Sequence, residues 1–428
     1  MRHTNPCCKF KKTISVLLVG VVVVTVIAFV VQIHTVENLS FVSINHYRDS
    51  SASVNVNDSE LPFTLSGIEY GAPVYSVTEG EQPLELDDTW YFGGDYSQIG
   101  SFPLDEARVF GSLTETPNDL GSYSPAILQE DCALALSFGP NVIEGNYYEP
   151  QDGYGTDDFI VWRSGELAHS IDGVNDNWAL QVYSADTDEC VTIDTSSWLN
   201  ETHDTPRLPG EIVPTFNSKY VCFASNVSID NSWHPKVIVY DREDDFKRYI
   251  VADGSYPCAS CNQVLYACST EKEMMYNQLM GWDGLSSEKI FSIDQSNLWG
   301  ISGIWSSSSV IAVSISENPT SIDCQGRGAY IGLWDISSMQ PIMWVHVNSP
   351  SVIGSMNEDW FVWGSGSQDD CAGMYGLNIG DHEICFLGET RGYSRPKIAI
   401  QNNAVLLPSL KENLGAVRFQ LGVLPSER

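Results

Sequence analysis

Basic residues are scarce in this chain. Among its 428 residues, 22 Lys and Arg stand against 55 Asp and Glu, and the formal net charge is −33. A surface with this acidic excess repels the phosphate backbone of DNA and RNA. The sequence therefore predicts a protein without a nucleic-acid partner. Its hydrophobic content of 43% is enough for a packed core and excludes a disordered acidic tail.

A second long hydrophobic run is also missing. The first covers residues 14–31, which would span about 27 Å as an α-helix, close to the thickness of the hydrocarbon layer. Four basic residues precede this run, and every acidic residue follows His34. Because basic flanks stay on the inner side, we expect a cytoplasmic N-terminus. A cleaved signal peptide would need a shorter apolar segment and a small-x-small cleavage site, and neither precedes residue 34.

These features predict a single-pass protein of the plasma membrane. Its helix would be the part that interacts with the membrane. We expect a cytoplasmic tail at residues 1–12, a transmembrane helix at 13–34, a flexible stalk at 35–60 and an extracytoplasmic domain at 61–428. The segment after His34 holds 18 of the 22 basic residues and all 55 acidic ones, so its formal charge is −37.

Helical periodicity is absent after the hydrophobic run. Instead, a polar turn followed by a short apolar strand recurs, and we call these strands the anchors. They begin at Phe159, Tyr220, Val264, Val310, Trp360 and Ala404. From Tyr220 onward they lie 44, 46, 50 and 44 residues apart. That period is typical of the four-stranded blades of a β-propeller.

The sequence therefore predicts an all-β propeller of about seven four-stranded blades, with six and eight as alternatives. Residues 88–92 are a candidate seventh anchor. The interval from Trp90 to Phe159 is too long for one blade and too short for two, so either an eighth partial repeat or an inserted loop occupies residues 126–156. The last repeat lacks an outer strand. We expect residues 68–77 to supply it and close the ring.

Aromatic-Asp dipeptides end several of the strands that follow the anchors, as at Tyr240-Asp241 and Trp334-Asp335. With these dipeptides and the 45-residue period, the chain resembles the TolB-like and WD40-like β-propeller superfamily over residues 62–424. The resemblance implies the fold alone. The Gly-His partner of WD40 blades and the Ser-Pro-Asp-Gly turn of TolB-like chains are both missing.

Nine cysteines follow the predicted span, and an extracytoplasmic domain favours disulfides. Cys258 and Cys261 could form a short structural bridge, a redox pair or half of a zinc site. No second Cys-x-x-Cys motif or nearby His pair supports zinc, and no helix N-terminus is predicted to activate a thiol. We expect Cys324 and Cys371 to be bridged, since they occupy equivalent loops of adjacent blades.

No cofactor is predicted, although acidic clusters at residues 152–158, 172–177 and 368–370 could bind Ca²⁺. None has EF-hand spacing, so solvated carboxylates are the preferred interpretation. No catalytic motif is found, and the catalytic residues are unknown. Most tryptophans, such as Trp162, Trp282, Trp305, Trp334 and Trp363, are expected in blade cores. The candidates for a recognition face are the loop aromatics Tyr147, Tyr148, Trp198 and Trp233.

The function that the sequence favours is a membrane-anchored binding or scaffold module for extracytoplasmic protein or glycan ligands. This expectation rests on the fold and not on a site. The alternative is a cell-surface propeller enzyme, a hydrolase or lyase directed at polysaccharide or peptide, with paired carboxylates near the ring axis.

Overall fold

The computed structural model covers residues 1–428, and its described residues all lie in the second of two compact units, Ile44–Arg428. They are residues 54–58, 60–80, 83–92, 102–105, 108–114, 123–128, 134–138, 142–143, 146–166, 170–171, 174–175, 177–196, 207–209, 213–229, 232–261, 263–270, 275–294, 298–317, 328–349, 352–365, 373–389, 398–410 and 417–425. The predicted tail and transmembrane helix lie outside them, as does most of the predicted stalk. Within the described residues, no helix is long and apolar enough to cross a membrane.

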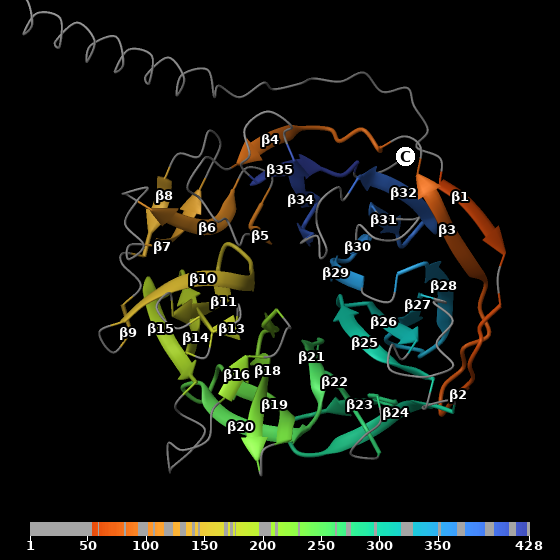
Figure 1. Ribbon diagram of the computed structural model, residues 1–428, viewed down its shortest axis with the longest axis horizontal. Coiled ribbons are helices and arrows are strands. Elements are labelled where there is room, and N and C mark those ends of the chain that lie inside the picture. Colours follow the sequence, from red (N-terminus) through yellow and green to blue (C-terminus); the bar gives the residue numbers. More distant parts are fainter. Residues whose placement is uncertain are drawn as a thin grey trace, which may run out of the picture. The chain divides into compact units, whose positions relative to one another are not determined.

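Seven sheets surround a common axis in the second unit, which is a seven-bladed β-propeller (Figure 1). Blade one contains β5 (Phe102–Pro103), β6 (Val109–Thr114), β7 (Tyr123–Leu128) and β8 (Leu134–Ser137). Blade two contains β10 (Asn146–Gly155), β11 (Phe159–Glu166), β14 (Trp178–Ser184) and β15 (Glu189–Thr195). The short strands β9 (Val142–Ile143), β12 (Ser170–Ile171) and β13 (Val174–Asn175) accompany blade two.

The next three blades repeat this arrangement. Blade three contains β17 (Thr215–Phe216), β18 (Tyr220–Ile229), β19 (Ser232–Asp241) and β20 (Lys247–Asp253), with β16 (Arg207–Pro209) beside β18. Blade four contains β21 (Ser255–Ala259), β22 (Val264–Cys268), β23 (Gln278–Trp282) and β24 (Ser287–Ile293). Blade five contains β25 (Trp299–Ser306), β26 (Val310–Glu317), β27 (Ala329–Asp335) and β28 (Pro341–Val347).

Blades six and seven complete the ring. Blade six contains β29 (Val352–Met356), β30 (Trp360–Ser365), β31 (Met374–Asn378) and β32 (Glu383–Gly388). Blade seven contains β33 (Ala399–Gln401), β34 (Ala404–Leu410), β35 (Val417–Val423) and, as its outer strand, β4 (Thr89–Phe92). The six predicted anchors are the second strands of blades two to seven, so this part of the repeat is confirmed.

The anchors are strongly apolar because both faces of a second strand lie against neighbouring blades. In β26 all eight residues are buried, whereas the first three residues of the outer strand β24 are exposed. The predicted blade-core tryptophans are confirmed: Trp162, Trp282, Trp334 and Trp363 are buried, and half-buried Trp305 packs against the core.

Each junction between neighbouring blades is filled by its own hydrophobic cluster. At the junction of blades two and three, Val161 and Leu180 pack with Phe223. At the junction of blades seven and one, Leu421 packs with Val109. Because the last junction is packed like the others, the apolar sides of the first and last blades are both covered.

The outer strands share a device that protects sheet edges. In blades one to six, the register between the third and fourth strands shifts by one residue, which is a β-bulge. Bulges twist an outer strand away from pairing with another chain. The pairing of β35 with β4 has no such shift.

A segment that we call the N-terminal strap, residues 61–92, follows the outer edges of blades four to seven. Its strand β2 (Leu65–Ser66) pairs with β24 of blade four, and β3 (Val74–Gly80) pairs in parallel with β28 of blade five. β1 (Val54–Asp58) adds to the outer side of β3. The Leu84 N–H then donates to the Phe386 carbonyl of blade six, before β4 completes blade seven.

Side chains also fix the strap. Phe63 is buried, with its ring 5.3 Å from that of Trp299 and 5.7 Å from that of Trp344 between ring centroids. The indole N–H of Trp334 donates to the Glu69 carbonyl at 3.0 Å, and that of Trp344 donates to the Tyr70 carbonyl at 3.0 Å. These buried donors would otherwise lack partners, so they hold the strap in one register.

Two predictions about ring closure were wrong. Residues 68–77 do not close the ring, since β3 extends blade five instead. Residues 88–92 are not an anchor, because β4 is the closing outer strand. The interval from Trp90 to Phe159 contains all four strands of blade one, so an eighth partial repeat is also excluded. A strand's composition indicates that it pairs but not with which partner, and these pairings join residues hundreds of positions apart.

The strap leads to a prediction about deletions. Removing residues 1–60 should leave a folded protein, since the strap and β4 remain. Removing residues 1–92 should expose the edge of β35 and the last junction, and so cause aggregation or lower the melting temperature by about 10 °C or more. Thermal melts followed by circular dichroism would measure this. Similar melting of the two deletion proteins would show that the ring closes without β4.

Candidate functional site

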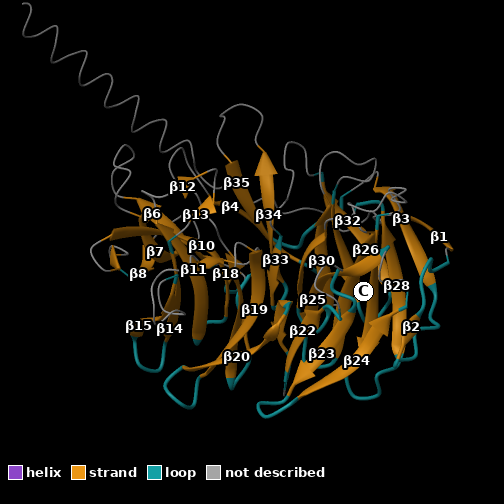
Figure 2. Cartoon of the chain, turned by 60° about the horizontal axis from the view of Figure 1, so that its bottom comes forward, coloured by secondary structure: helices purple, strands orange, loops and turns teal. Residues whose placement is uncertain are grey.

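The turns between first and second strands, which we call the inner turns, encircle one end of the ring axis. Since neighbouring strands of a blade are antiparallel, these turns and those between third and fourth strands lie on the same face. We call it the turn face. In Figure 2 the turns that join β14 to β15, β19 to β20 and β23 to β24 lie together along the lower edge of the ring.

Five inner turns have the same geometry. The N–H of the first turn residue donates to the carbonyl of the residue three positions later, at 2.8–3.0 Å; the first residues are Thr156, Asn217, Ser260, Ser307 and Asn357. The side-chain oxygens of Asn217, Ser307 and Asn357 also accept hydrogen bonds from the N–H groups two and three positions later. This capping explains why a small polar residue recurs before the anchors.

Neighbouring inner turns are bonded to one another around the axis. Asn217 Nδ2 of blade three donates to the Ser260 carbonyl of blade four. Cys261 Sγ donates to the Ser308 carbonyl of blade five, at 3.0 Å. The Ser308 N–H donates to Glu358 Oε1 of blade six, at 2.7 Å, and Asn357 Nδ2 donates to the Asn402 carbonyl of blade seven.

A second set of bonds lies one step deeper, on the innermost strands. The Ala259 N–H of blade four donates to Thr215 Oγ1 of blade three, at 2.9 Å. The Ile400 N–H of blade seven donates to Ser355 Oγ of blade six, at 3.2 Å. In blades three and six, the acceptor is thus a hydroxyl residue that lies two positions before the asparagine of the turn. Together, the two sets join the inner sides of blades three to seven.

Glu358 keeps its charge in this ring. Partial burial raises the pKa of its carboxyl group. Hydrogen bonds from Ser308, Ser309 and Ser307 in the neighbouring turn have the opposite effect and are stronger in sum, so the pKa is lowered overall. The carboxyl is therefore ionised at neutral pH. Its side chain is also exposed, so the negative charge faces solvent at the turn face.

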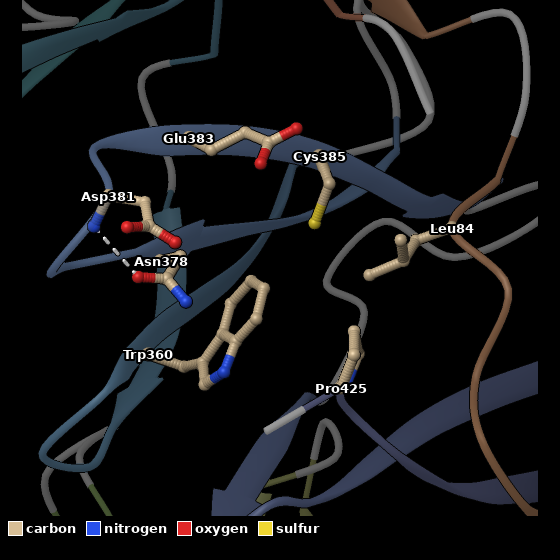
Figure 3. A pocket seen from close by; sticks show the side chains of 7 residues that line it. All are labelled: Leu84, Trp360, Asn378, Asp381, Glu383, Cys385 and Pro425. Atoms are coloured by element: carbon tan, nitrogen blue, oxygen red, sulfur yellow. Dashed lines mark hydrogen bonds between the residues drawn. The ribbon is translucent and has the colours of Figure 1, made fainter. Parts of the chain in front are cut away.

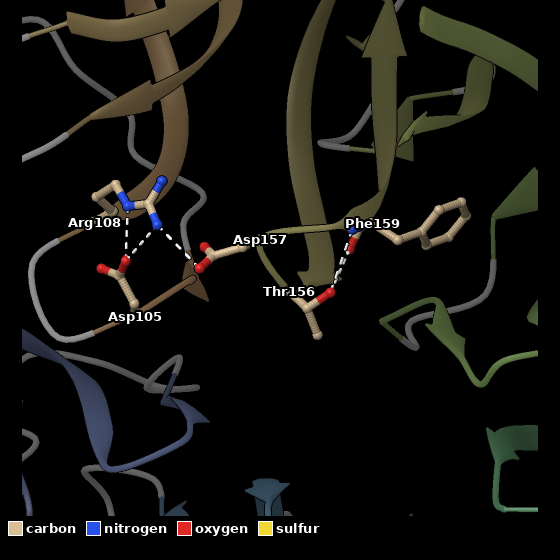
Figure 4. A network of polar contacts seen from close by, with 5 residues as sticks. All are labelled: Asp105, Arg108, Thr156, Asp157 and Phe159. Carbon is tan, nitrogen blue, oxygen red and sulfur yellow. Dashed lines mark hydrogen bonds and ion pairs between the residues drawn. The ribbon is translucent and has the colours of Figure 1, made fainter. Parts of the chain in front are cut away.

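The turns of blades one and two are joined by an ion pair (Figure 4). Arg108 Nη2 lies 2.6 Å from Asp105 Oδ2 and 3.0 Å from Asp157 Oδ2. Burial raises the pKa of Asp157, and the charge of Arg108 opposes this while Asp105 and Asp158 add to it. One guanidinium is thus shared between two carboxylates, and the charge of Asp158 lies nearby, which leaves this part of the face acidic.

Tyr154 lies on β10, two residues before the turn at Thr156. Its ring packs against Phe216 of blade three, 5.4 Å between centroids. Burial raises its pKa to about 12, and the charges of Cys258 in blade four and Glu358 in blade six add to the shift. The Tyr154 side chain packs against the hydrophobic cluster at the junction of blades two and three. It is neutral at physiological pH.

A small pocket lies elsewhere on the ring, at the outer part of blade six (Figure 3). It is lined by Leu84 of the strap, Pro425 after β35, and Trp360, Asn378, Asp381, Glu383 and Cys385 of blade six. Asn378 Oδ1 accepts a hydrogen bond from the Asp381 N–H at 3.0 Å, which closes the turn at its rim. The buried indole of Trp360 forms part of its wall.

The predicted recognition aromatics are not assembled by the described side chains. Tyr148 on β10 is only 6% exposed. Tyr147 precedes it on the same strand and Trp233 lies on β19, but their side chains are outside the described ones, as is all of Trp198. A recognition face made of these four residues stays a prediction.

The cysteine predictions have different outcomes. Cys258 and Cys261 are free thiols and form no bridge. Cys258 is buried on β21 with its Sγ 3.5 Å from Ser306 Oγ, whereas Cys261 is exposed and its Sγ donates to the Ser308 carbonyl of the blade-five turn. Burial raises the pKa of Cys258 to about 11. Cys324 and Cys371 lie outside the described residues, and their bridge stays a prediction.

The acidic clusters considered for Ca²⁺ are only partly described. In the first, Asp152 pairs with Arg163 at 2.7 Å and Asp157 pairs with Arg108. Most of the other two lies outside the described residues. In the part of the chain that the structure describes, no group of three or more His, Cys, Asp or Glu side chains is arranged to hold a metal ion.

No known protein family and no curated protein matches the sequence. Solved structures match in fold. An oligogalacturonate lyase in complex with manganese has a TM-score of 0.50 and 9% identity, covering 85% of this chain and 98% of the lyase. The β-propeller domain of the Trilobed protease from Pyrococcus furiosus has a TM-score of 0.48 and 10% identity, over 76% of this chain and 94% of that domain.

TolB from Acinetobacter baumannii also matches, with a TM-score of 0.34 and 10% identity over 64% of this chain and 79% of TolB. At these identities the similarity shows the β-propeller fold alone. The predicted propeller architecture is confirmed by the seven blades of the structure itself. The similarity does not transfer a substrate, a metal or an activity.

The bonds between turns lead to a prediction about Asn217. Asn217→Ala removes both the turn cap and the bond to blade four, so the free energy of unfolding should fall by about 2 kcal/mol. Asn217→Asp keeps the acceptor oxygen but loses the donor, and should cost about 1 kcal/mol. Ser218→Ala, in the same exposed turn, is the control. Urea unfolding that gave equal stabilities for Asn217→Ala and Ser218→Ala would contradict this role.

Proposed function

We propose that this protein is a membrane-anchored binding or scaffold module, which displays an acidic β-propeller outside the cell for protein or glycan ligands. The observation that carries the proposal is the chain of hydrogen bonds that joins the inner turns of blades three to seven. A surface that is fixed before its ligand arrives loses little conformational entropy on binding. Inner turns held together across blades three to seven therefore suit recognition of an extended partner.

Electrostatics support binding over proton transfer at the turn face. The hydrogen bonds that lower the pKa of Glu358 keep its carboxyl group ionised, whereas a general acid needs a pKa near the working pH. An ionised, immobilised carboxylate is suited to recognising positive charge. The alternative, a hydrolase or lyase on a propeller frame, would need other carboxylates, and its catalytic residues are unknown.

The proposed anchor predicts the orientation of the chain. Residues 13–34 would cross the membrane with the basic tail inside, so the propeller would be outside. Protease added to intact cells should remove the chain beyond about residue 40 while an N-terminal tag stays protected. Full protection of the propeller, with digestion only after the cells are lysed, would refute this orientation.

The binding function itself is tested with arrays. The purified full-length protein should bind a limited set of glycans or proteins on an array, and binding should be lost after heat unfolding, because the surface depends on the ring. The protein with residues 1–92 deleted is a second control, since it lacks the closing strand. Equal signals from native and unfolded protein, or no native signal on any array, would contradict the proposal.

A further inference from the structure

The outer strand of blade three, β20, has a sheet edge that no other strand covers among the described residues. It is the last strand of its sheet, after β16, β18 and β19 (Figure 1). The strap bonds to the outer strands of blades four to seven but not to β20. An uncovered edge keeps a row of backbone N–H and C=O groups available for another strand.

β20 is also more exposed than other outer strands. The outer strands of blades two, four, five and six each contain buried residues, whereas β20 contains none. Ile250, in the middle of β20, is 54% exposed, more than any other large apolar side chain on a described strand. An exposed apolar residue on an open sheet edge favours pairing with a strand of another chain.

One face of β20 packs toward blade four. The ring centroid of Tyr249 lies 5.7 Å from that of Trp282, and Val251 and Ala252 contact the same hydrophobic cluster. These two consecutive residues share a face because the β-bulge of β20 lies between Ile250 and Ala252. Val251 is the extra residue of this bulge.

The other face of β20 carries one apolar side chain between two charges. Arg248 points toward blade two, where its Nη1 atom lies 3.4 Å from Asp194 Oδ1. Ile250 is two residues further along and shares this face, since side chains alternate along a strand. Asp253 follows Ala252, which faces blade four, and is therefore on the blade-two face as well.

We infer that β20 pairs with the β20 strand of a second copy of this chain, antiparallel and with Ile250 on the two-fold axis. Such an interface uses the same surface of both copies. The two Ile250 side chains then lie opposite each other and cover one another's exposed surface. The bulge does not exclude this pairing, since the outer strands of blades four and five are also bulged and still accept β2 and β3.

The charges along the edge are complementary in this register. Tyr249 opposes both Val251 and Ala252 of the second copy, so Arg248 comes opposite Asp253 of the second copy, on the same face. Each of these charged side chains has an ion-pair partner within its own chain but is still partly exposed, by 32% and 67%. The two-fold symmetry repeats the contact, so a pair of opposite charges lies on each side of the central isoleucines.

Disulfide cross-linking tests the register. Full-length protein with Ile250→Cys should form a disulfide-linked dimer on mild oxidation, because directly opposed residues have Cα atoms about 4.5–5.5 Å apart, which a disulfide can bridge. Val191→Cys is the matched control, since Val191 is 41% exposed on the outer strand of blade two. Non-reducing gels compare both variants with the wild-type protein, which has the same native cysteines, and mass spectrometry identifies the link between the two positions 250.

Association in solution tests the contact itself. The full-length protein should form a dimer that dissociates on dilution, since a single strand pair is a small interface. Ile250→Glu places two like charges opposite each other and should weaken dimerisation at least about tenfold. Val191→Glu makes the same change on another outer strand and should alter it less than about twofold. Light scattering over a dilution series measures the dissociation constants, and circular-dichroism melts verify that both variants are folded.

Three results would overturn the inference. One is a wild-type protein that stays monomeric, and slow hydrogen exchange of the β20 amides in that monomer would mean that another segment of the same chain covers the edge. Equal weakening by Ile250→Glu and Val191→Glu would mean that the copies meet elsewhere. Equal cross-linking at positions 191 and 250 would mean that the thiols react in random collisions.

Discussion

The pairing of β4 with β35 is the constraint on which the rest of the structure depends. β4 lies near the start of the described chain and β35 at its end, and their antiparallel pairing completes blade seven. Without it, β35 would present an open edge, and the junction of blades seven and one would lose Trp90. The strap that leads to β4 is therefore a part of the ring and not a tether that merely touches it.

Closure has consequences at the axis. Blades contact only their neighbours, so a ring is rigid when every junction is filled, as the seven hydrophobic clusters show. The inner turns are then held at fixed separations, close enough for side chains of one blade to reach the backbone of the next. Asn217 and Asn357 do this with the same geometry in blades three and six. The turn face owes its rigidity to these contacts.

Much of the fold could be predicted from the sequence because the anchors carry two signals at once. A polar residue caps the turn, and a fully buried strand follows, as at Asn357 and Trp360. The second strand of blade one was missed, since the turn before Val109 uses the ion pair of Asp105 and Arg108 instead of an asparagine or serine cap. The closing strand was assigned to the wrong segment because composition does not specify a distant partner.

The site was harder to predict than the fold. Glu358 was visible only as one member of a recurring polar turn, and Tyr154 as an aromatic residue in an acidic loop. Which turns share a face follows from how the blades are arranged around the axis, and the sequence near either residue does not show this. The repeated pattern of a hydroxyl residue two positions before an asparagine, at Thr215 and Ser355, was the one local signal that could have indicated bonded turns.

Hydrogen exchange measured by mass spectrometry tests the central claim, that the strap is an integral part of the closed ring. Amides of Thr89–Phe92 should exchange as slowly as those of β35, and both should become fast together when the ring opens in mild denaturant. Fast exchange of Thr89–Phe92 under native conditions, with β35 still protected, would contradict it.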